Sequence, residues 1–164
     1  MIERKYLAHY IDEAFSMEVP SYTRLGKDLE EYNIELNPEV ESKQNILGEN
    51  SVVVSGYEAS SSVEPYYCDR DNPLSEKLMD IAMNRLTGDN CKTTVVDVLL
   101  APGEDGAKPE CVWAYKEDCL VVPESIGGDT SGIQIPFTIH RAGNRVKGTF
   151  DLATKKFTAD ENGL

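Results

Sequence analysis

The chain reads Tyr57-Glu58-Ala59-Ser60-Ser61-Ser62-Val63-Glu64-Pro65 near its middle, and this stretch alternates between two kinds of side chain. Small or apolar residues hold every second position, and the positions between them hold Glu58, Ser60, Ser62 and Glu64. Successive side chains of a β-strand point to opposite faces of its sheet. The stretch therefore predicts a strand with one buried face and one wet, acidic face.

The same two-residue period recurs along the chain. Ile133, Ile135, Phe137 and Ile139 alternate with more polar residues, and Pro136 lies among them. Because proline has no N–H to donate, Pro136 is expected at a sheet edge or a bulge. Further strands are expected at residues 6–11, 21–25, 29–36, 93–100, 112–122, 146–151 and 156–158. This pattern predicts a mainly β fold.

One helix is expected among the strands, over residues 73–87. Asn72 can cap its N-terminus, Pro73 suits the first helical position, and Gly88 would end it. Its apolar stripe recurs at helical spacing and consists of Leu74, Leu78, Ile81 and Ala82. We expect this stripe to pack against the sheet.

A polar stretch at residues 37–51 is expected to be a long loop. Its 15 residues exceed the usual connection within a compact domain, and loops of this length tend to be functional or disordered. Ile46 and Leu47 lie near its end and have no obvious apolar partner.

The composition limits the classes of function. The chain has 164 residues, which fits a single domain over residues 1–164. With 16 Lys and Arg against 29 Asp and Glu, its formal net charge is −13, which disfavours tight binding to nucleic-acid phosphates. The N-terminal residues lack the apolar run of a signal peptide, and no stretch is apolar enough for a membrane helix. We therefore expect a cytosolic protein without membrane contact.

No motif in the sequence predicts catalysis, a metal or a cofactor. The segment Gly127–Gly132 looks like the surroundings of a nucleophilic serine, but His9 and His140 are the only histidines and no lysine follows the glycines. We expect a turn between strands there. His140 and Arg141 are expected as polar residues at a strand end. The cysteines lack the spacing of zinc ligands and are expected as free thiols: Cys68, Cys91, Cys111 and Cys119.

Several runs resemble prophage-encoded tail proteins of long-tailed, siphovirus-like bacteriophages of Gram-positive hosts. They cover most of the chain: Ile2–Asp12, Arg24–Tyr32, Asn45–Glu49, Gly56–Glu58, Val63–Tyr67, Asn84–Gly88 and Val122–Asp129. The resemblance implies a major tail tube protein, a small β-sandwich or barrel with one packed helix. Such subunits form hexameric rings that stack into a hollow tube, with four strands of each subunit joining those of its neighbours around an acidic lumen.

The resemblance also implies partners and locations. The subunit would bind copies of itself and other tail proteins such as the tape measure and the tail terminator. Double-stranded DNA would pass through the tube without tight binding. The protein would occupy the host cytoplasm during assembly and the virion tail afterwards.

Two site hypotheses follow from the resemblance. Glu58, Ser60, Ser62 and Glu64 would line the lumen, where carboxylates keep the passing DNA from adhering; the alternative is a solvated strand facing outward. Val40, Ile46 and Leu47 of the 37–51 loop would contact the neighbouring ring; the alternative is a merely flexible loop.

Two other readings remain open. The inner tube of a contractile tail or of a type VI secretion system shares the implied fold. A monomeric β-sandwich hydrolase or carbohydrate-binding module would need a convergent acid pair or an exposed aromatic platform, and the sequence identifies neither.

Overall fold

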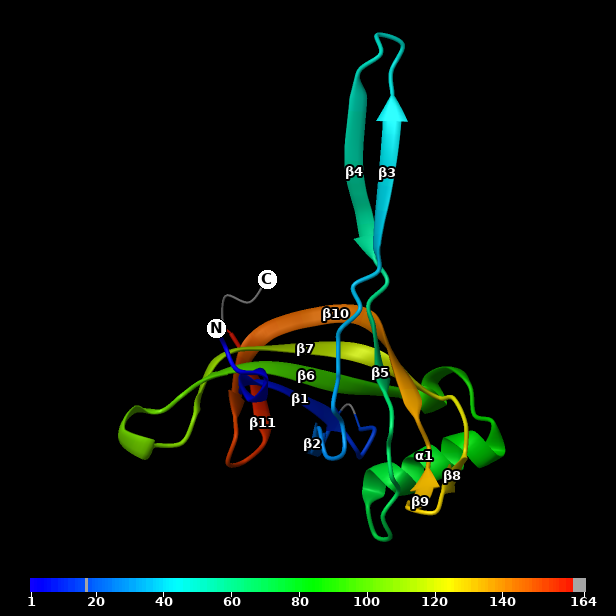
Figure 1. Ribbon diagram of the computed structural model, residues 1–164, viewed down its shortest axis with the longest axis vertical. Helices are drawn as coiled ribbons and strands as arrows, with labels where there is room; N and C mark the ends of the chain where they lie inside the picture. Colours follow the sequence, from blue (N-terminus) through cyan, green and yellow to red (C-terminus); the bar gives the residue numbers. More distant parts are fainter. Residues whose placement is uncertain (17, 161–164) are drawn as a thin grey trace.

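The protein is built around one antiparallel sheet, which the computed structural model describes over residues 1–16 and 18–160 (Figure 1). The strand order is β11-β10-β7-β6-β1-β2, and β5 also pairs with β10. The strands are β1 (Leu7–Asp12), β2 (Tyr22–Leu25), β5 (Ser60–Val63), β6 (Lys92–Ala101), β7 (Glu110–Pro123), β10 (Phe137–Asp151) and β11 (Lys156–Ala159). The mainly β fold class is confirmed.

The sheet curls into a half-barrel because β10 bends. Its register with β7 shifts between Arg141 and Gly143 and again between Gly143 and Val146, and such bulges increase the local twist of a strand. One end of β10 pairs with β5 and the other with β11. Figure 1 shows β10 arching over β7 and β6.

The curl creates a separate core on each side of the sheet. One core lies beneath the helix and includes Ile11, Val63, Leu78 and Phe137. The other lies within the curl, where the rings of Tyr10 and Phe150 are 4.4 Å apart between centroids. β1 and β6 contribute side chains to both cores, so their buried residues run almost without interruption.

Helix α1 (Pro73–Asn84) forms where the capping residues predict it. The Asn72 side chain accepts hydrogen bonds from the backbone N–H groups of Leu74 and Ser75. The helix ends at Asn84 and not at residue 87, because Arg85 adopts a left-handed conformation with φ 50°. Leu74, Leu78 and Ile81 are buried, and Ala82 is partly buried.

Three of the expected strands are wrong as stated: residues 29–36, the strand around Pro136, and the strand at 57–65, which is described with the arm below. Residues 29–36 form no strand; they cross over the sheet as a segment anchored by the buried ring of Tyr32, with a single bridge from Glu35 to Ser60. The expected strand around Pro136 is split at that proline into β9 (Gly132–Gln134) and β10, since Pro136 cannot donate to a ladder. We call residues 26–36 the crossing segment.

The short hairpin of β8 (Gly127–Asp129) and β9 contains the expected turn. Asp129 accepts a hydrogen bond from the backbone N–H of Ser131 at 2.8 Å, which is the local bonding expected of a polar turn residue.

The expected loop at residues 37–51 is also wrong, because it is part of a β-hairpin. Strands β3 (Pro38–Gln44) and β4 (Asn50–Tyr57) pair along their whole length and project from the sheet (Figure 1). Neither face of the hairpin is buried, so its sequence shows no hydrophobic alternation. The sequence of this stretch therefore predicts a loop. We call this hairpin the arm. The expected strand at 57–65 breaks at Glu58 and Ala59, between the arm and β5.

Candidate functional site

The arm stands away from the rest of the molecule (Figure 1). All of β3 is exposed, and in β4 only Gly56 is partly buried. The seven residues of β3, at about 3.4 Å each, carry the arm roughly 24 Å outward. Within the part of the chain that the structure describes, β3 and β4 pair only with each other. Among the described residues, the arm therefore receives little packing beyond the contact between its own two strands.

The ladder of the arm gathers valines on one face. Val40 pairs with Val54 and Ser42 pairs with Val52, so these side chains share a face, whereas Val53 pairs with Glu41 on the opposite face. Val40, Val52 and Val54 are 57%, 68% and 52% exposed. We call the side bearing Val40, Val52 and Val54 the valine face.

The tip of the arm is an ordered turn over residues 45–49. The Asn45 Oδ1 atom accepts hydrogen bonds from the backbone N–H groups of Leu47 and Glu49 at 2.9 and 3.0 Å, and its Nδ2 donates to the Glu49 carboxylate at 3.1 Å. Gly48 has φ 79°, which glycine adopts without steric cost. The turn holds Ile46 and Leu47 in water. The structure thus places Val40 on the valine face and Ile46 and Leu47 at the tip.

The residues expected to line a lumen lie beyond the base of the arm. On β5, Ser62 is exposed and Ser60 is partly buried; Glu58 is exposed just before this strand and Glu64 just after it. Ser61 and Val63 point the other way and are buried. Ser62 and Glu64 share a shallow hollow with Glu31 and Glu35 of the crossing segment. The acidic surface therefore includes two carboxylates that the strand pattern does not predict.

A group of charged side chains is buried between the sheet and the crossing segment. Arg141 on β10 binds Asp97 on β6 through both guanidinium Nη atoms, at 2.6 Å to Oδ2 and 3.4 Å to Oδ1. His9 Nδ1 lies 2.7 Å from Asp97 Oδ1, and Glu117 Oε1 lies 3.5 Å from Arg141 Nη1. The side chains of Arg141 and Asp97 are 2% and 3% exposed. We call His9, Asp97, Glu117 and Arg141 the ion cluster.

The ion cluster also binds the crossing segment to the sheet. Arg141 Nη2 donates to the Tyr32 hydroxyl and to Ser61 Oγ, both at 3.3 Å. Arg4 Nη2 lies 2.9 Å from His9 Nε2, and since arginine has only donors, His9 Nε2 is the acceptor. His9 is therefore neutral in this arrangement and donates from Nδ1 to Asp97. The cluster joins β1, β6, β7 and β10 to the segment above them.

Burial and pairing act on the pKa values in opposite directions. Burial disfavours the charged form of Asp97, but the His9 hydrogen bond and the Arg141 charge outweigh it and hold the pKa of Asp97 below its ordinary value. Burial likewise opposes the charge on Arg141, yet the Asp97 carboxylate raises the pKa of Arg141. Burial raises the pKa of the neighbouring Cys119 thiol to about 12, so this thiol stays protonated at neutral pH.

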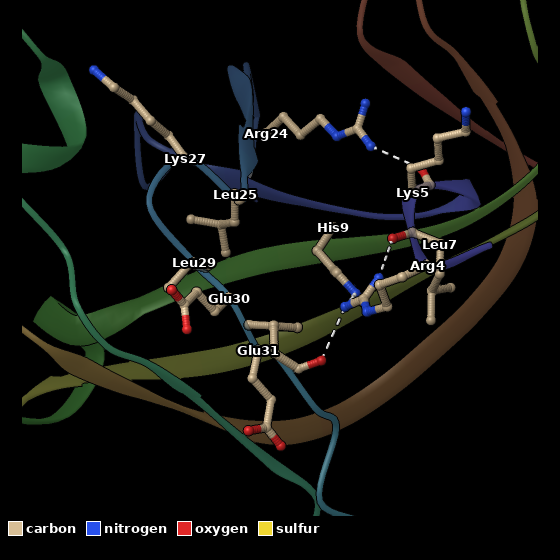
Figure 2. A pocket seen from close by; sticks show the side chains of 12 residues that line it. Arg4, Lys5, Leu7, His9, Arg24, Leu25, Lys27, Leu29, Glu30 and Glu31 are labelled. Atoms are coloured by element: carbon tan, nitrogen blue, oxygen red, sulfur yellow. Dashed lines mark hydrogen bonds between the residues drawn. The ribbon is translucent and has the colours of Figure 1, made fainter.

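A second charged feature is open to solvent at the start of β1 and the end of β2. It is a hollow of about 500 Å³ between the 3-10 turn Arg4–Tyr6, β2 and the crossing segment. Figure 2 shows the leucines of its floor between Lys5, Arg24 and Lys27 on one side and Glu30 and Glu31 on the other. We call it the basic hollow; its floor consists of Leu7, Leu25 and Leu29, and its cations are Arg4, Lys5, Arg24 and Lys27.

The two arginines of the basic hollow bind backbone oxygens. Arg24 Nη2 donates to the carbonyl of Lys5 at 3.1 Å, and Arg4 donates to the carbonyls of Leu7 and Tyr32 at 2.6 and 3.0 Å (Figure 2). Among the described residues, neither guanidinium has a carboxylate within 4 Å. Two arginines without an acidic partner are notable in a chain of net charge −13.

The described ranges contain neither a cluster of metal-ligating side chains nor a membrane-spanning helix. Within residues 1–16 and 18–160, no three His, Cys, Asp or Glu side chains are grouped so that they could hold a metal ion. No helix in these same ranges is long and apolar enough to cross a membrane.

Comparison with known proteins assigns no family to the chain. No protein-family model matches it, and no curated protein is significantly similar to it in sequence.

Neither the ion cluster nor the basic hollow is predicted from the sequence. Arg141 was expected at a strand end, whereas it lies within β10 and is buried. Its partner Asp97 stands in an apolar run, Val95-Val96-Asp97-Val98-Leu99, and a single acid in such a run is the one signal that could have indicated a buried pair. The basic hollow joins two separate stretches of the chain, residues 4–9 and 24–32, which no local pattern connects.

Proposed function

We propose that this protein is the structural subunit of a phage tail tube, which assembles into stacked hexameric rings that conduct DNA. The observation that carries the proposal is the arm, a long hairpin whose apolar side chains are largely exposed in the described part of the subunit. The resemblance of the sequence to tail proteins of long-tailed phages supports the same function.

The arm needs a partner for energetic reasons. An isolated two-stranded hairpin is at best marginally stable in water, and natural proteins seldom leave apolar strands exposed. Full burial of Ile46 and Leu47 would contribute about 1.5–3 kcal/mol each. A neighbouring ring that covers the tip and the valine face supplies this burial, and the arms of six subunits add their contributions.

The two edges of the sheet favour lateral assembly. Among the described residues, β2 pairs only with β1, and β11 pairs only with β10. Open edges promote uncontrolled aggregation unless they are covered. Two different edges that meet head to tail form a closed ring, which removes both.

The acidic surface at Glu58, Ser60, Ser62 and Glu64 is proposed to line the lumen. Glu31 and Glu35 beside it increase the density of carboxylates. A negatively charged wall repels the DNA phosphates and so permits passage without adhesion. In this proposal the tape measure and the tail terminator meet the rings during assembly in the host cytoplasm, and the rings remain in the virion tail.

Sedimentation velocity and electron microscopy of the full chain test the proposal. We expect rings or hollow filaments of uniform bore as the concentration rises. Deletion of residues 40–48 should leave a folded subunit that no longer forms filaments, because it removes Val40, Ile46 and Leu47. A wild-type chain that stays monomeric at every concentration would contradict the proposed function, and so would long filaments from the deletion variant.

A further inference from the structure

We infer that the basic hollow is the socket that receives the arm tip of a second copy of this chain. This inference rests on the proposed function and deepens it, because it names the surface that covers the tip. It is carried by the match between two features at opposite ends of the molecule, each of which lacks a partner among the described residues.

The chemistry of the tip and of the hollow is complementary. The tip presents two adjacent apolar side chains, Ile46 and Leu47, which are 102% and 76% exposed, next to the Glu49 carboxylate. The hollow has a floor of Leu7, Leu25 and Leu29 beneath a cationic rim. Apolar side chains of the tip fit the leucine floor, and the carboxylate fits the rim.

The charge distribution fixes how the tip is oriented. Four cations and two carboxylates line the hollow: Arg4, Lys5, Arg24, Lys27, Glu30 and Glu31. Lys5 and Lys27 already lie 3.3 and 3.7 Å from Glu3 and Asp69, while Arg4 and Arg24 have no carboxylate partner among the described residues. Glu49 therefore turns toward Arg24, and Glu30 and Glu31 repel it from the opposite side.

The occupant has to come from another copy. The arm extends roughly 24 Å as an ordered ladder, and Figure 1 shows its tip at the far end of the molecule from β2. The subunit cannot reach its own hollow without breaking that ladder. If the contact between a tip and a hollow is not reciprocated, it is heterologous, and its repetition along an axis produces the open stack that a tube of rings needs.

Reversal of charge on each side tests the socket in the full chain. Arg24→Glu and Glu49→Arg should each raise the concentration needed for assembly roughly tenfold or more, since each places like charges together. The double variant R24E/E49R restores opposite charges and should assemble at a concentration closer to that of the wild type. Lys108→Glu is the matched control, because Lys108 is an exposed cation outside the hollow and its substitution changes the net charge by the same amount.

The outcomes separate the socket from the proposed function. Thermal unfolding checks that each variant is folded; if R24E is not, Lys27→Glu replaces it, because the Lys27 side chain is 81% exposed. Assembly by R24E and E49R at the wild-type concentration would overturn the socket and leave the tube subunit standing. The socket would also be overturned if the double variant needed as high a concentration for assembly as the single variants. A wild-type chain that never self-associates would overturn both.

Discussion

Apolar side chains are usually buried and charged side chains are usually exposed, and the arm and the ion cluster are opposite exceptions to this rule. The arm places valines in water, whereas the ion cluster places Asp97 and Arg141 out of it. The buried charges pair with one another within one subunit, so the role of the cluster is to hold the strands together. In the part of the chain that the structure describes, β3 and β4 of the arm pair only with each other. The difference teaches that an exposed apolar ladder indicates a partner, while a buried ion pair indicates internal structure.

The largest expected effect comes from breaking the ion cluster. Arg141→Ala leaves Asp97 buried without its cation, and removal of one partner of a buried ion pair typically costs about 3–5 kcal/mol. We expect the free energy of unfolding, measured with urea on the dilute subunit, to fall by that amount. A loss under about 1 kcal/mol would mean that the pair contributes no more than a surface ion pair does.

The next effect separates the two faces of the arm. Val54→Asp puts a charge on the valine face, and burial of one valine is worth about 1.5–3 kcal/mol, so the concentration needed for assembly should rise roughly tenfold to a hundredfold. Val53→Asp is the matched control on the opposite face, one residue away. Neither substitution should change the unfolding free energy of the dilute subunit by more than about 0.5 kcal/mol.

The Val54→Asp and Val53→Asp variants also test the contrast between the exposed arm and the internally paired ion cluster. Equal loss of assembly in both variants would show that the arm is not covered on one face only. A large loss of subunit stability in Val54→Asp would show that the arm packs on its own subunit.

The smallest effect is the response of the ion cluster to acid. The fold lowers the pKa of Asp97. The contribution of Asp97 to stability is therefore complete above the ordinary Asp pKa of about 3.9. This contribution is lost as the pH falls through the lowered pKa of the folded state. Urea midpoints measured between about pH 5 and pH 2 should decline less steeply in Asp97→Asn than in the wild type. Identical slopes of the urea midpoint against pH would show that Asp97 does not contribute to the loss of stability in acid.

The sequence predicts those parts of the fold that leave a local pattern. Alternation marks β5 and the start of β10 because one face of each is buried, and Asn72 with Pro73 marks the start of α1 because capping needs only neighbouring residues. The arm escapes prediction because burial on one face is what creates the alternation. Its consecutive valines, Val52-Val53-Val54, were the available indication of a strand.

The candidate site is predictable only in part for the same reason. Ile46 and Leu47 are conspicuous within a polar stretch, so the sequence identifies the tip. The ion cluster depends on residues far apart along the chain, because Asp97 is 88 positions after His9 and Arg141 is 44 positions after Asp97. Only the sheet order, which places β1, β6, β7 and β10 side by side, brings these residues together.

Hydrogen–deuterium exchange of the arm backbone, in dilute subunits and in assembled material, is the most direct test of the account. The account predicts that amides of residues 38–57 exchange rapidly in the dilute subunit and become protected on assembly, while those of the buried strand β6 are protected in both. Rapid exchange of the arm in both states would contradict the claim that another copy of the chain covers it.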